Sequence, residues 1–395
     1  MKKILYIHHC SVFGGASRSI YEAIKAFPDG QVDPYFLCAK GSASKKFLEL
    51  TENVIETRGI SAFDHTKFSY YRGRRWLVLL REFFFLGFTF FSMLKARVVW
   101  GKDAFNAIHI NEITLTPVII FAKILFKAPI ICHCRSIQAN NVGELRENLI
   151  RKIVNRYVSC VVAIDNDCSR SLSLDIPVHV IHNGLNVTGT SYFSNKKFQD
   201  KFTVGFVGNL LPSKGIYDLI ECAKKYKQME VDEVIFLIVG PSFEQEASIF
   251  DQIFSFLGFR ELAGKKILSL ITKYELDNVI NIGFQDDISS VFQGMDILCF
   301  PSHLDAVGRP VFEAAYFGVP SVVAVTNPTP DTFIPNITGV KVRNKCPADL
   351  YDAIELYRNS PETLSTHGDN SRVLSNEYYN ISKNSQMLVN LYGSV

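Results

Sequence analysis

The chain has 395 residues, of which 47% are hydrophobic and 21% are charged, so it is long enough for two domains and too apolar for extensive disorder. Its 42 Lys and Arg residues nearly balance 39 Asp and Glu residues, which excludes nucleic acid binding driven by bulk charge. The nine cysteines are scattered, as is typical of a reducing compartment, and the apolar run 4–7 is too short for a signal peptide. We therefore expect a cytoplasmic protein with no nucleic acid partner.

Short apolar runs alternate with longer amphipathic stretches along the chain, and this pattern predicts an α/β fold with parallel sheets covered by helices. In the first half, strands are predicted over residues 4–8, 35–38, 107–110, 129–133, 160–164 and 178–181. The polar stretch 186–200 interrupts the pattern. Further strands are predicted over residues 202–207, 234–239, 279–282, 297–300 and 321–325.

Two Rossmann-like doubly wound domains account for this order of elements. The predicted parts are an N-terminal domain over 1–185, a linker over 186–200, a C-terminal domain over 201–370, and a helical segment over 371–395 that packs back on the N-terminal domain. Ligands of open α/β sheets bind beyond the carboxyl ends of the strands, so we expect the chemistry to lie between the two domains.

Residues 70–102 combine two tryptophans and six phenylalanines with seven Arg and Lys residues. The longest charge-free run, 83–94, is shorter than the roughly 20 residues that a membrane-spanning helix needs. A basic, aromatic helix of this kind is typical of segments that lie on an anionic membrane surface, which is the interpretation that we favour. A buried crossover helix with charged ends would have the same composition.

Two glycine turns follow predicted strands. Gly14 and Gly15 precede one amphipathic stretch, and Gly208 and Lys214 precede another. Glycine lets the backbone approach a phosphate or a sugar, and the N–H groups at a helix start attract anions. An ordinary strand-to-helix turn and a solvated surface lysine would give the same two patterns. Neither turn contains the complete Gly-x-Gly-x-x-Gly motif of nicotinamide and flavin enzymes.

The stretch 301–320 carries the most specific pattern. A predicted strand ends at residue 300, a loop follows with Asp305 and Gly308, and Glu313 lies on the predicted helix after it. Such a loop presents N–H groups to an anion, and Glu313 is placed to reach the hydroxyl groups of a ribose. A local structural role for Glu313 would explain neither the glycine nor the second carboxylate.

With this motif the sequence resembles, over nearly the whole chain, the family-4 retaining glycosyltransferases of the GT-B fold, of the type that builds bacterial surface polysaccharides. The motifs that carry the resemblance are Gly14-Gly15-Ala16, Ile108-His109-Ile110-Asn111, Ile130-Ile131-Cys132-His133-Cys134-Arg135, His182-Asn183-Gly184, Val207-Gly208-Asn209, Lys214-Gly215 and Asp305-x7-Glu313. The resemblance implies a nucleotide-diphosphate sugar as donor, with a UDP-sugar as the expected one. It also implies a glycan acceptor, expected to be lipid-linked at the inner membrane face.

The resemblance also implies roles for individual residues. In that family a lysine binds the diphosphate, one carboxylate lies by the donor sugar, and a second binds the ribose; Lys214, Asp305 and Glu313 match these positions. The histidine at the end of the fourth N-domain strand, His133 here, contacts the donor sugar in that family. The expected catalytic residues are therefore His133, Lys214, Asp305 and Arg309. The expected donor-binding residues are Gly14, Gly15, Gly208, Asn209, Lys214, Gly308, Arg309 and Glu313.

Two positions depart from the family pattern. Asp305 stands where the family usually has Glu, so its side chain is one methylene shorter and reaches less far toward the sugar. Asn209 stands where the family usually has a basic residue, and we expect Arg309 in the phosphate loop to take over that role.

The implied mechanism is electrostatic. The leaving diphosphate is stabilised by Lys214, Arg309 and backbone N–H groups while the acceptor hydroxyl attacks from the same face, and the phosphate takes the proton. No metal or other cofactor is expected. The run 165–167 resembles the Asp-x-Asp metal motif of the other glycosyltransferase fold, but it lies between a strand and a helical stretch, so we expect Asp165 to cap that helix.

Two other functions are compatible with the same fold. A nucleotide-sugar epimerase would need an acid and a base, for which His133 and Asp305 are candidates. A non-catalytic nucleotide-sugar-binding subunit would explain the departures at Asp305 and Asn209. We favour the transferase because its resemblance covers most of the chain.

Overall fold

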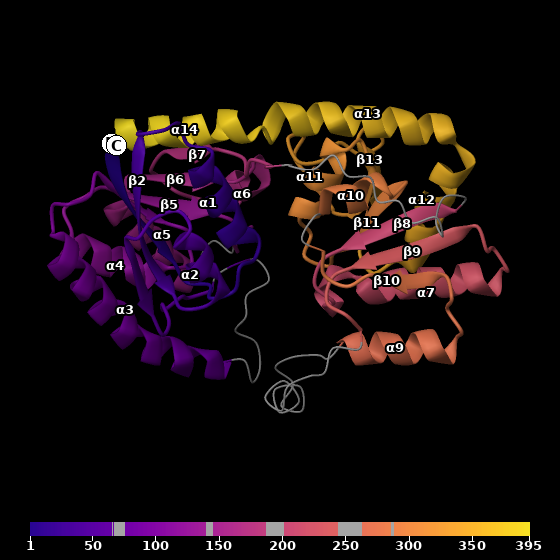
Figure 1. Ribbon diagram of the computed structural model, residues 1–395, viewed down its shortest axis with the longest axis horizontal. Helices are drawn as coiled ribbons and strands as arrows, with labels where there is room; N and C mark the ends of the chain where they lie inside the picture. The colour runs from indigo at the N-terminus through magenta and orange to yellow at the C-terminus, as the bar shows by residue number, and fades with distance from the viewer. Residues whose placement is uncertain (65, 67–75, 140–144, 187–200, 244–262, 286–287) are drawn as a thin grey trace. The chain divides into compact units, whose positions relative to one another are not determined.

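The computed structural model describes residues 1–64, 66, 76–139, 145–186, 201–243, 263–285 and 288–395. It divides into two compact units, which are described separately (Figure 1). Unit 1 comprises Met1–Asn186 and Tyr379–Val395, and unit 2 comprises Val187–Tyr378. The predicted linker, 186–200, lies outside the described residues apart from Asn186.

A parallel sheet forms the centre of unit 1, and its seven strands within the described residues have the order β3-β2-β1-β4-β5-β6-β7. The strands are β1 (Lys2–His8), β2 (Val32–Ala39), β3 (Val54–Thr57), β4 (Ala107–Ile110), β5 (Ile130–Cys134), β6 (Cys160–Ala163) and β7 (Val178–Val180). Along β1, Ile4 and Tyr6 join one buried cluster while Leu5 and Ile7 join another. Both faces of the sheet are therefore apolar and covered, as in a doubly wound fold.

Helices cover the two faces of this sheet, with α3, α4 and α5 on one face and α1, α2 and α14 on the other. Their bounds, with the short α6, are α1 (Gly15–Lys25), α2 (Ser42–Phe47), α3 (Val78–Trp100), α4 (Thr116–Leu125), α5 (Leu145–Tyr157), α6 (Asn166–Arg170) and α14 (Ile381–Ser394). The C-terminal α14 belongs to unit 1 because Leu388 and Tyr392 are buried in its core. Its start packs on Gly184, where an added Cβ would lie 2.5 Å from the Cα of Ile381.

Unit 2 contains a second parallel sheet, with the strand order β10-β9-β8-β11-β12-β13 in the described residues. Its strands are β8 (Phe202–Val207), β9 (Val234–Val239), β10 (Val279–Asn281), β11 (Ile297–Phe300), β12 (Ser321–Ala324) and β13 (Gly339–Val342). The helical elements are η3 (Pro212–Lys214), α7 (Ile216–Gln228), α9 (Ala263–Lys273), α10 (Ile288–Gln293), α11 (Arg309–Tyr316), α12 (Pro347–Asn359) and α13 (Pro361–Tyr378). Strands β8 and β11 are neighbours, so the loops at their carboxyl ends lie at one edge of the sheet.

Two details differ from the sequence-based expectation. Strands β3 and β13 were not predicted. Unit 2 also extends to Tyr378 instead of residue 370, because α13 packs on α11: Ser375 donates a hydrogen bond of 3.1 Å to the carbonyl of Phe312.

Helix α3 exposes large apolar side chains on its outward face, while its inward face packs Met93 and Ala96, together with two polar side chains, against unit 1. Its inward side includes Glu82 and Thr89, whereas Leu80, Phe84 and Phe91 are exposed. The charge-free run 83–94 is too short to cross a membrane, but α3 is 23 residues long and contains an 18-residue window with a mean hydropathy of 1.4, so by length and composition alone the helix could span one. A core helix of a soluble domain can pass the same test, and this helix does pack on unit 1 through its inward face.

Candidate functional site

Lys214 lies at the end of η3, directly before α7. Its ammonium nitrogen is 5.5 Å from the centre of the Phe300 ring, at the end of β11. Partial burial lowers the pKa of Lys214. No carboxylate of the described residues forms an ion pair with it, so the site holds a partly desolvated cation that an anion would neutralise.

The turn that carries Lys214 is fixed by Gly215. This glycine has a φ of +75°, and a Cβ at its position would lie 1.9 Å from the carbonyl oxygen of Pro301. Only glycine allows the turn after β8 to approach the end of β11 so closely. The backbone of Gly215 thus determines the position of Lys214 beside the β11–α11 loop.

The β11–α11 loop presses on the same aromatic ring. Gly308 precedes the first turn of α11, and a Cβ there would lie 2.4 Å from the Phe300 ring. The ring of Phe300 therefore lies between the lysine turn and the start of α11. The sequence analysis singled out Lys214 and Gly308 but missed the phenylalanine that brings them together.

Asp305 adopts a left-handed backbone conformation with a φ of +47°, which aspartate tolerates better than most residues. One oxygen of its carboxylate accepts a 2.7 Å hydrogen bond from the backbone N–H of Thr326, which follows β12. In this structure Asp305 therefore joins two neighbouring loops at the carboxyl edge of the sheet.

Arg309 and Glu313 form an ion pair within the first turns of α11. The Nε of Arg309 donates to Oε1 of Glu313 at 2.8 Å, and their side chains are only 16% and 9% exposed. The pair holds the Glu313 carboxylate in one orientation and balances the charge of Arg309. Arg309 was expected to stand in for a missing diphosphate ligand, and the structure places its Nε on the predicted ribose ligand.

A histidine that the sequence analysis missed ties the lysine turn to the β11–α11 loop. The backbone N–H of His303 donates to the carbonyl of Ser213 at 2.9 Å. Its Nε2 is 2.8 Å from a carboxylate oxygen of Asp218 on α7. The only sequence signal for this contact was the position of His303, three residues after a buried strand.

Three of the predicted donor-binding glycines have open space in front of them. A Cβ at Gly14, Gly15 or Gly208 would meet no atom within 4 Å, so packing does not demand glycine there. Gly208 has a φ of +151°, and the next residue, Asn209, is exposed. A ligand could approach the backbone at each of these positions.

In unit 1, His133 belongs to a chain of hydrogen bonds at the end of β5. Its Nδ1 is 3.1 Å from Nε2 of His109 and 3.2 Å from a guanidinium nitrogen of Arg135. The Nδ1 of His109 is in turn 2.7 Å from the hydroxyl of Tyr392 on α14. His109, His133 and Tyr392 are all buried.

These contacts assign the protons of both imidazoles. Arginine has no acceptor, so Nδ1 of His133 must accept and its proton must be on Nε2. His109 then donates from Nε2 to His133 and accepts from Tyr392 on Nδ1. The Nε2 of His133 is buried and has no hydrogen-bond partner among the described residues, so it is a free N–H donor.

The environment also keeps these imidazoles neutral. Burial, followed by the charge of Arg135, lowers the pKa of His133 well below its ordinary value, and the same two causes lower the pKa of His109 to about 3. His133 is therefore suited to donate a hydrogen bond to a sugar or phosphate oxygen and unsuited to act as a base, because its acceptor nitrogen is occupied.

We expect NMR of the protein labelled with 15N-histidine to show His133 and His109 as neutral, Nε2-protonated rings that do not titrate between about pH 5 and pH 8. Replacing Arg135 with Gln removes the cation and the donor that fixes the tautomer, so the pKa of His133 should rise. A wild-type His133 with its proton on Nδ1, or one that titrates near the ordinary histidine value, would contradict the assignment.

The aspartates at 165–167 do not form a metal site in the structure. Asp165 caps α6, and its carboxylate accepts a 2.6 Å hydrogen bond from the backbone N–H of Cys168, as predicted. Asp167 pairs with Arg170 at 2.7 Å. Across the described part of the chain, no group of three or more His, Cys, Asp or Glu residues is arranged to hold a metal ion.

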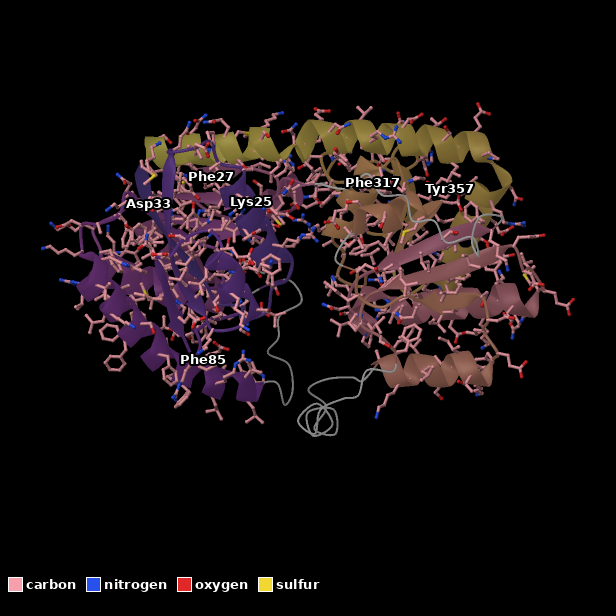
Figure 2. The ribbon with its side chains drawn as sticks, in the orientation of Figure 1. Lys25, Phe27, Asp33, Phe85, Phe317 and Tyr357 are labelled. Carbon is pink, nitrogen blue, oxygen red and sulfur yellow. The ribbon has the colours of Figure 1, made fainter. Side chains whose placement is uncertain are left out.

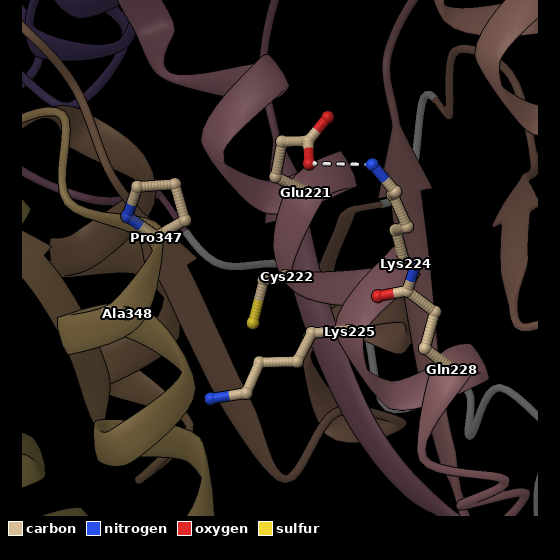
Figure 3. Close-up of a pocket in the computed structure, with 7 residues that line it drawn as sticks. All are labelled: Glu221, Cys222, Lys224, Lys225, Gln228, Pro347 and Ala348. Atoms are coloured by element: carbon tan, nitrogen blue, oxygen red, sulfur yellow. Dashed lines mark hydrogen bonds and ion pairs between the residues drawn. The ribbon is translucent and has the colours of Figure 1, made fainter.

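A hollow of about 330 Å³ between α7 and α12 lies apart from all of these residues (Figure 3). Its lining consists of Glu221, Cys222, Lys224, Lys225, Gln228, Pro347 and Ala348. Glu221 and Lys224 bridge one rim at 3.4 Å. None of the predicted site residues lines this hollow.

Comparison with known proteins relates unit 2 to one enzyme family. Residues 189–373, which contain Lys214, Asp305 and Glu313, match the family described as glycosyl transferases group 1. Over 178 residues the chain is 27% identical to the capsular polysaccharide biosynthesis glycosyltransferase CapM of Staphylococcus aureus. That stretch covers 45% of this chain and 42% of the relative, so the chain matches less than half of that protein's length.

Solved structures similar to this one cover nearly the whole chain. HepE from Anabaena, in complex with UDP, has a TM-score of 0.74 at 18% identity with 100% of both chains covered. Sucrose-phosphate synthase from Thermosynechococcus elongatus has a TM-score of 0.71 at 18% identity, covering 100% of this chain and 99% of its own. TarM from S. aureus has a TM-score of 0.68 at 14% identity, covering 99% and 100%. The predicted fold class, two Rossmann-like domains of the GT-B type, is thereby confirmed.

Proposed function

We propose that this protein is a glycosyltransferase that moves a sugar from a nucleotide-diphosphate sugar to a hydroxyl group of a glycan acceptor, with retention of configuration. The observation that carries the proposal is the partly buried ammonium of Lys214, which has no ion-pair partner among the described residues and lies near the Phe300 ring, against which Gly308, the N-cap of α11, also packs. A diphosphate would supply the missing negative charge. The family match of residues 189–373 supports the same function.

The donor site is built in unit 2. Lys214 binds the diphosphate, the N–H groups around Gly308 complete its coordination, and Glu313 binds the ribose hydroxyls from the orientation that Arg309 imposes. UDP is the nucleotide that we propose, because the similar HepE structures contain UDP or UDP-glucose. Arg309 remains paired with Glu313. Its positive charge lies at the start of α11, and it contributes to the diphosphate site through the electrostatic field there.

The transfer step depends on stabilising the leaving group. As the bond between the anomeric carbon and the β-phosphate oxygen breaks, negative charge grows on the diphosphate and is stabilised by Lys214 and the backbone N–H groups. The acceptor oxygen bonds to the anomeric carbon from the same face, and the leaving phosphate takes the acceptor's proton. His133 donates its free Nε2–H to the donor sugar, as the resemblance implies. Fixed cations fill the role of a metal in this scheme.

The epimerase alternative is less well supported by the geometry. It needs an acid and a base, but the carboxylate of Asp305 is engaged by the backbone N–H of Thr326 and Nδ1 of His133 already accepts a hydrogen bond. The acceptor nitrogen of His133 is therefore not available as a base, and Asp305 has a structural role in joining two loops.

Replacing Lys214 with Ala should weaken UDP binding and reduce turnover by about 10²-fold or more, because the diphosphate loses a partly desolvated cation. Glu313→Gln should weaken the binding of UDP but not of inorganic diphosphate, since the ribose contact is lost. Isothermal titration calorimetry with UDP and diphosphate measures both effects. Lys265→Ala, at an exposed position on α9, is the matched control and should bind UDP like the wild type. Unchanged UDP affinity in Lys214→Ala would remove the donor-site assignment.

We also propose that α3 docks unit 1 on an anionic membrane surface, where a lipid-linked acceptor would be found. The outward stripe of the helix comprises Trp76, Leu77, Leu80, Phe83, Phe84, Phe91 and Val98, each more than half exposed. Arg81, Lys95 and Lys102 lie at exposed positions on or beside the helix. The inward face is anchored, since Phe85 (labelled in Figure 2) presses on Gly59, where an added Cβ would lie 2.6 Å from its ring.

This arrangement fits a helix that lies in the interface with its apolar side toward the lipid. Anionic lipid attracts each nearby Lys or Arg by about 1 kcal/mol, and buried phenylalanines add to that attraction. Arg72, Arg74 and Arg75, which also belong to the predicted basic segment, lie outside the described residues. The cytoplasmic, inner-face location remains part of this proposal.

The wild-type protein should sediment with vesicles of phosphatidylcholine and phosphatidylglycerol at low salt and should be released as salt rises, because screening weakens the attraction. Replacing Phe83, Phe84 and Phe91 with Ser should reduce binding at least about tenfold, since their insertion is lost. Phe284→Ser removes an equally exposed phenylalanine from unit 2 and is the control. Equal binding to pure phosphatidylcholine, or no binding, would contradict the proposal.

A further inference from the structure

Polar side chains from four segments meet at the carboxyl edge of the unit 1 sheet. His9 follows β1, Glu112 follows β4 and Arg135 follows β5. The backbone N–H of Arg135 donates to the Glu112 carboxylate, and the N–H of Ile113 donates to its Oε1 at 3.0 Å. The adjacent β-strand ends thus place Glu112 beside the segment that carries His133.

The fourth segment, of which residues 61–64 and 66 are described, contacts this edge. The N–H of Phe63 donates to the carbonyl of Thr114 at 2.9 Å, and Thr66 forms a β-bridge with Gln138. The segment carries Asp64, whose negative charge raises the pKa values of both His9 and Glu112. Its base is held by α3, where the N–H of Ala62 donates to Oε2 of Glu82 at 2.8 Å.

Glu112 is an acid in an unfavourable environment for its charge. Its pKa is raised to about 7, mainly by burial and to a smaller extent by the charge of Asp64. The Arg135 charge and the two backbone N–H groups act in the opposite direction. The thiols of Cys10 and Cys132 also face it, and their own pKa values are raised, so both are uncharged. Among the described residues, Glu112 forms no ion pair.

The charge of the neighbouring Arg135 favours the ionised form of Glu112, but its guanidinium donates hydrogen bonds to other groups. Arg135 donates to the side-chain oxygens of Asn111 and Asn183 at 2.8 Å, and to His133. Those acceptors are neutral. Glu112 is only partly buried, and it lies at the edge of the sheet where open α/β folds bind their ligands. A carboxylate whose charged form is disfavoured at such a place is typical of functional sites.

We propose that Glu112, with His9 at the end of the neighbouring strand β1, binds the hydroxyl group of the acceptor, and that unit 1 recognises its acceptor only when Glu112 is ionised. This inference rests on the proposed glycosyl transfer and names the residues of its acceptor side. An ionised carboxylate accepts a strong hydrogen bond from a hydroxyl and orients the oxygen for attack. The proton still passes to the leaving phosphate, so Glu112 is a binding and orienting group.

His9 supplies a second, neutral partner. Its pKa is lowered to about 4, mainly by burial and then by Arg81, so it carries no charge near neutral pH. Its Nδ1 is buried and has no hydrogen-bond partner among the described residues, whereas its Nε2 lies 3.4 Å from the sulfur of Cys10. The Glu112 carboxylate and this imidazole nitrogen follow the neighbouring strands β4 and β1, and together they match the paired donor and acceptor character of a sugar hydroxyl.

The pH dependence has a definite sign. Below the pKa of Glu112 the carboxyl is protonated and acceptor binding weakens, by about tenfold for each pH unit. Stability changes the opposite way. A raised carboxyl pKa in the folded state means that stability is highest when Glu112 is protonated and falls as pH rises through about 7.

The test uses the full chain and four probes, the n-octyl glycosides of glucose, galactose, mannose and N-acetylglucosamine, below their micelle concentrations. Calorimetry in the presence of UDP measures affinity at pH 6 and pH 8. We expect the wild type to bind at least one probe about tenfold more tightly at pH 8 than at pH 6, whereas Glu112→Gln binds it weakly at both. Glu52→Gln, at an exposed position of the same unit, is the control and should behave like the wild type.

Two further readouts separate the possible outcomes. Glu112→Gln should unfold at a higher temperature than the wild type at pH 8 and at the same temperature at pH 5, which excludes misfolding as the cause of weak binding. UDP affinity should be equal in the wild type and in Glu112→Gln. Failure of the wild type to bind UDP would refute the proposed donor site, whereas the probe affinities test the role of Glu112. Equal probe affinity in wild type and Glu112→Gln, or no pH-dependent binding of any probe, would overturn the inference.

Discussion

The ammonium group of Lys214 lies 5.5 Å from the centre of the Phe300 ring and has no ion-pair partner in the described part of the chain. The geometry around it follows from close backbone packing. Gly215 lets the lysine turn rest on Pro301, and Gly308 lets the β11–α11 loop rest on the other side of the Phe300 ring. A protein that leaves a partly buried cation unneutralised destabilises itself slightly, and a bound anion would restore the balance. The donor site of unit 2 depends on this one uncompensated charge.

Unit 1 shows the complementary arrangement, with an acid whose charge is unfavourable and a histidine kept neutral. Glu112 and His133 follow or end neighbouring strands, and Arg135 contacts both: its backbone donates to Glu112 and its side chain donates to His133. The same arginine therefore favours the ionised acid and disfavours a protonated imidazole. Each unit thus presents groups of defined charge and hydrogen-bonding direction, one set suited to a diphosphate and the other to hydroxyl groups.

The sequence predicted the central strands well, because they are buried on both faces and appear as continuous apolar runs. It missed β3 (Val54–Thr57) and β13 (Gly339–Val342), which lie at the edges of their sheets and carry exposed Glu56 and Lys341. Motif spacing predicted Lys214 and Glu313 as donor-site residues, and both lie at the carboxyl edge of the unit 2 sheet. It did not identify Phe300, His303 or Glu112. Their contacts come from segments that are distant in the sequence and that only the order of the strands brings together. The Arg309–Glu313 pair could have been predicted, since residues four apart on a helix face each other.

The proposed glycosyl transfer requires that the protein releases a nucleoside diphosphate from a nucleotide sugar. Purified protein would be incubated with a panel of UDP-, GDP-, ADP- and dTDP-sugars in the presence of excess chelator, and nucleoside diphosphate release would be followed with and without n-octyl glycosides. We predict release from one class of donor, with UDP-sugars as the expected class, that an acceptor accelerates and that the chelator leaves unchanged. No release from any donor, with or without added Mg²⁺ or Mn²⁺, would contradict the proposed transfer.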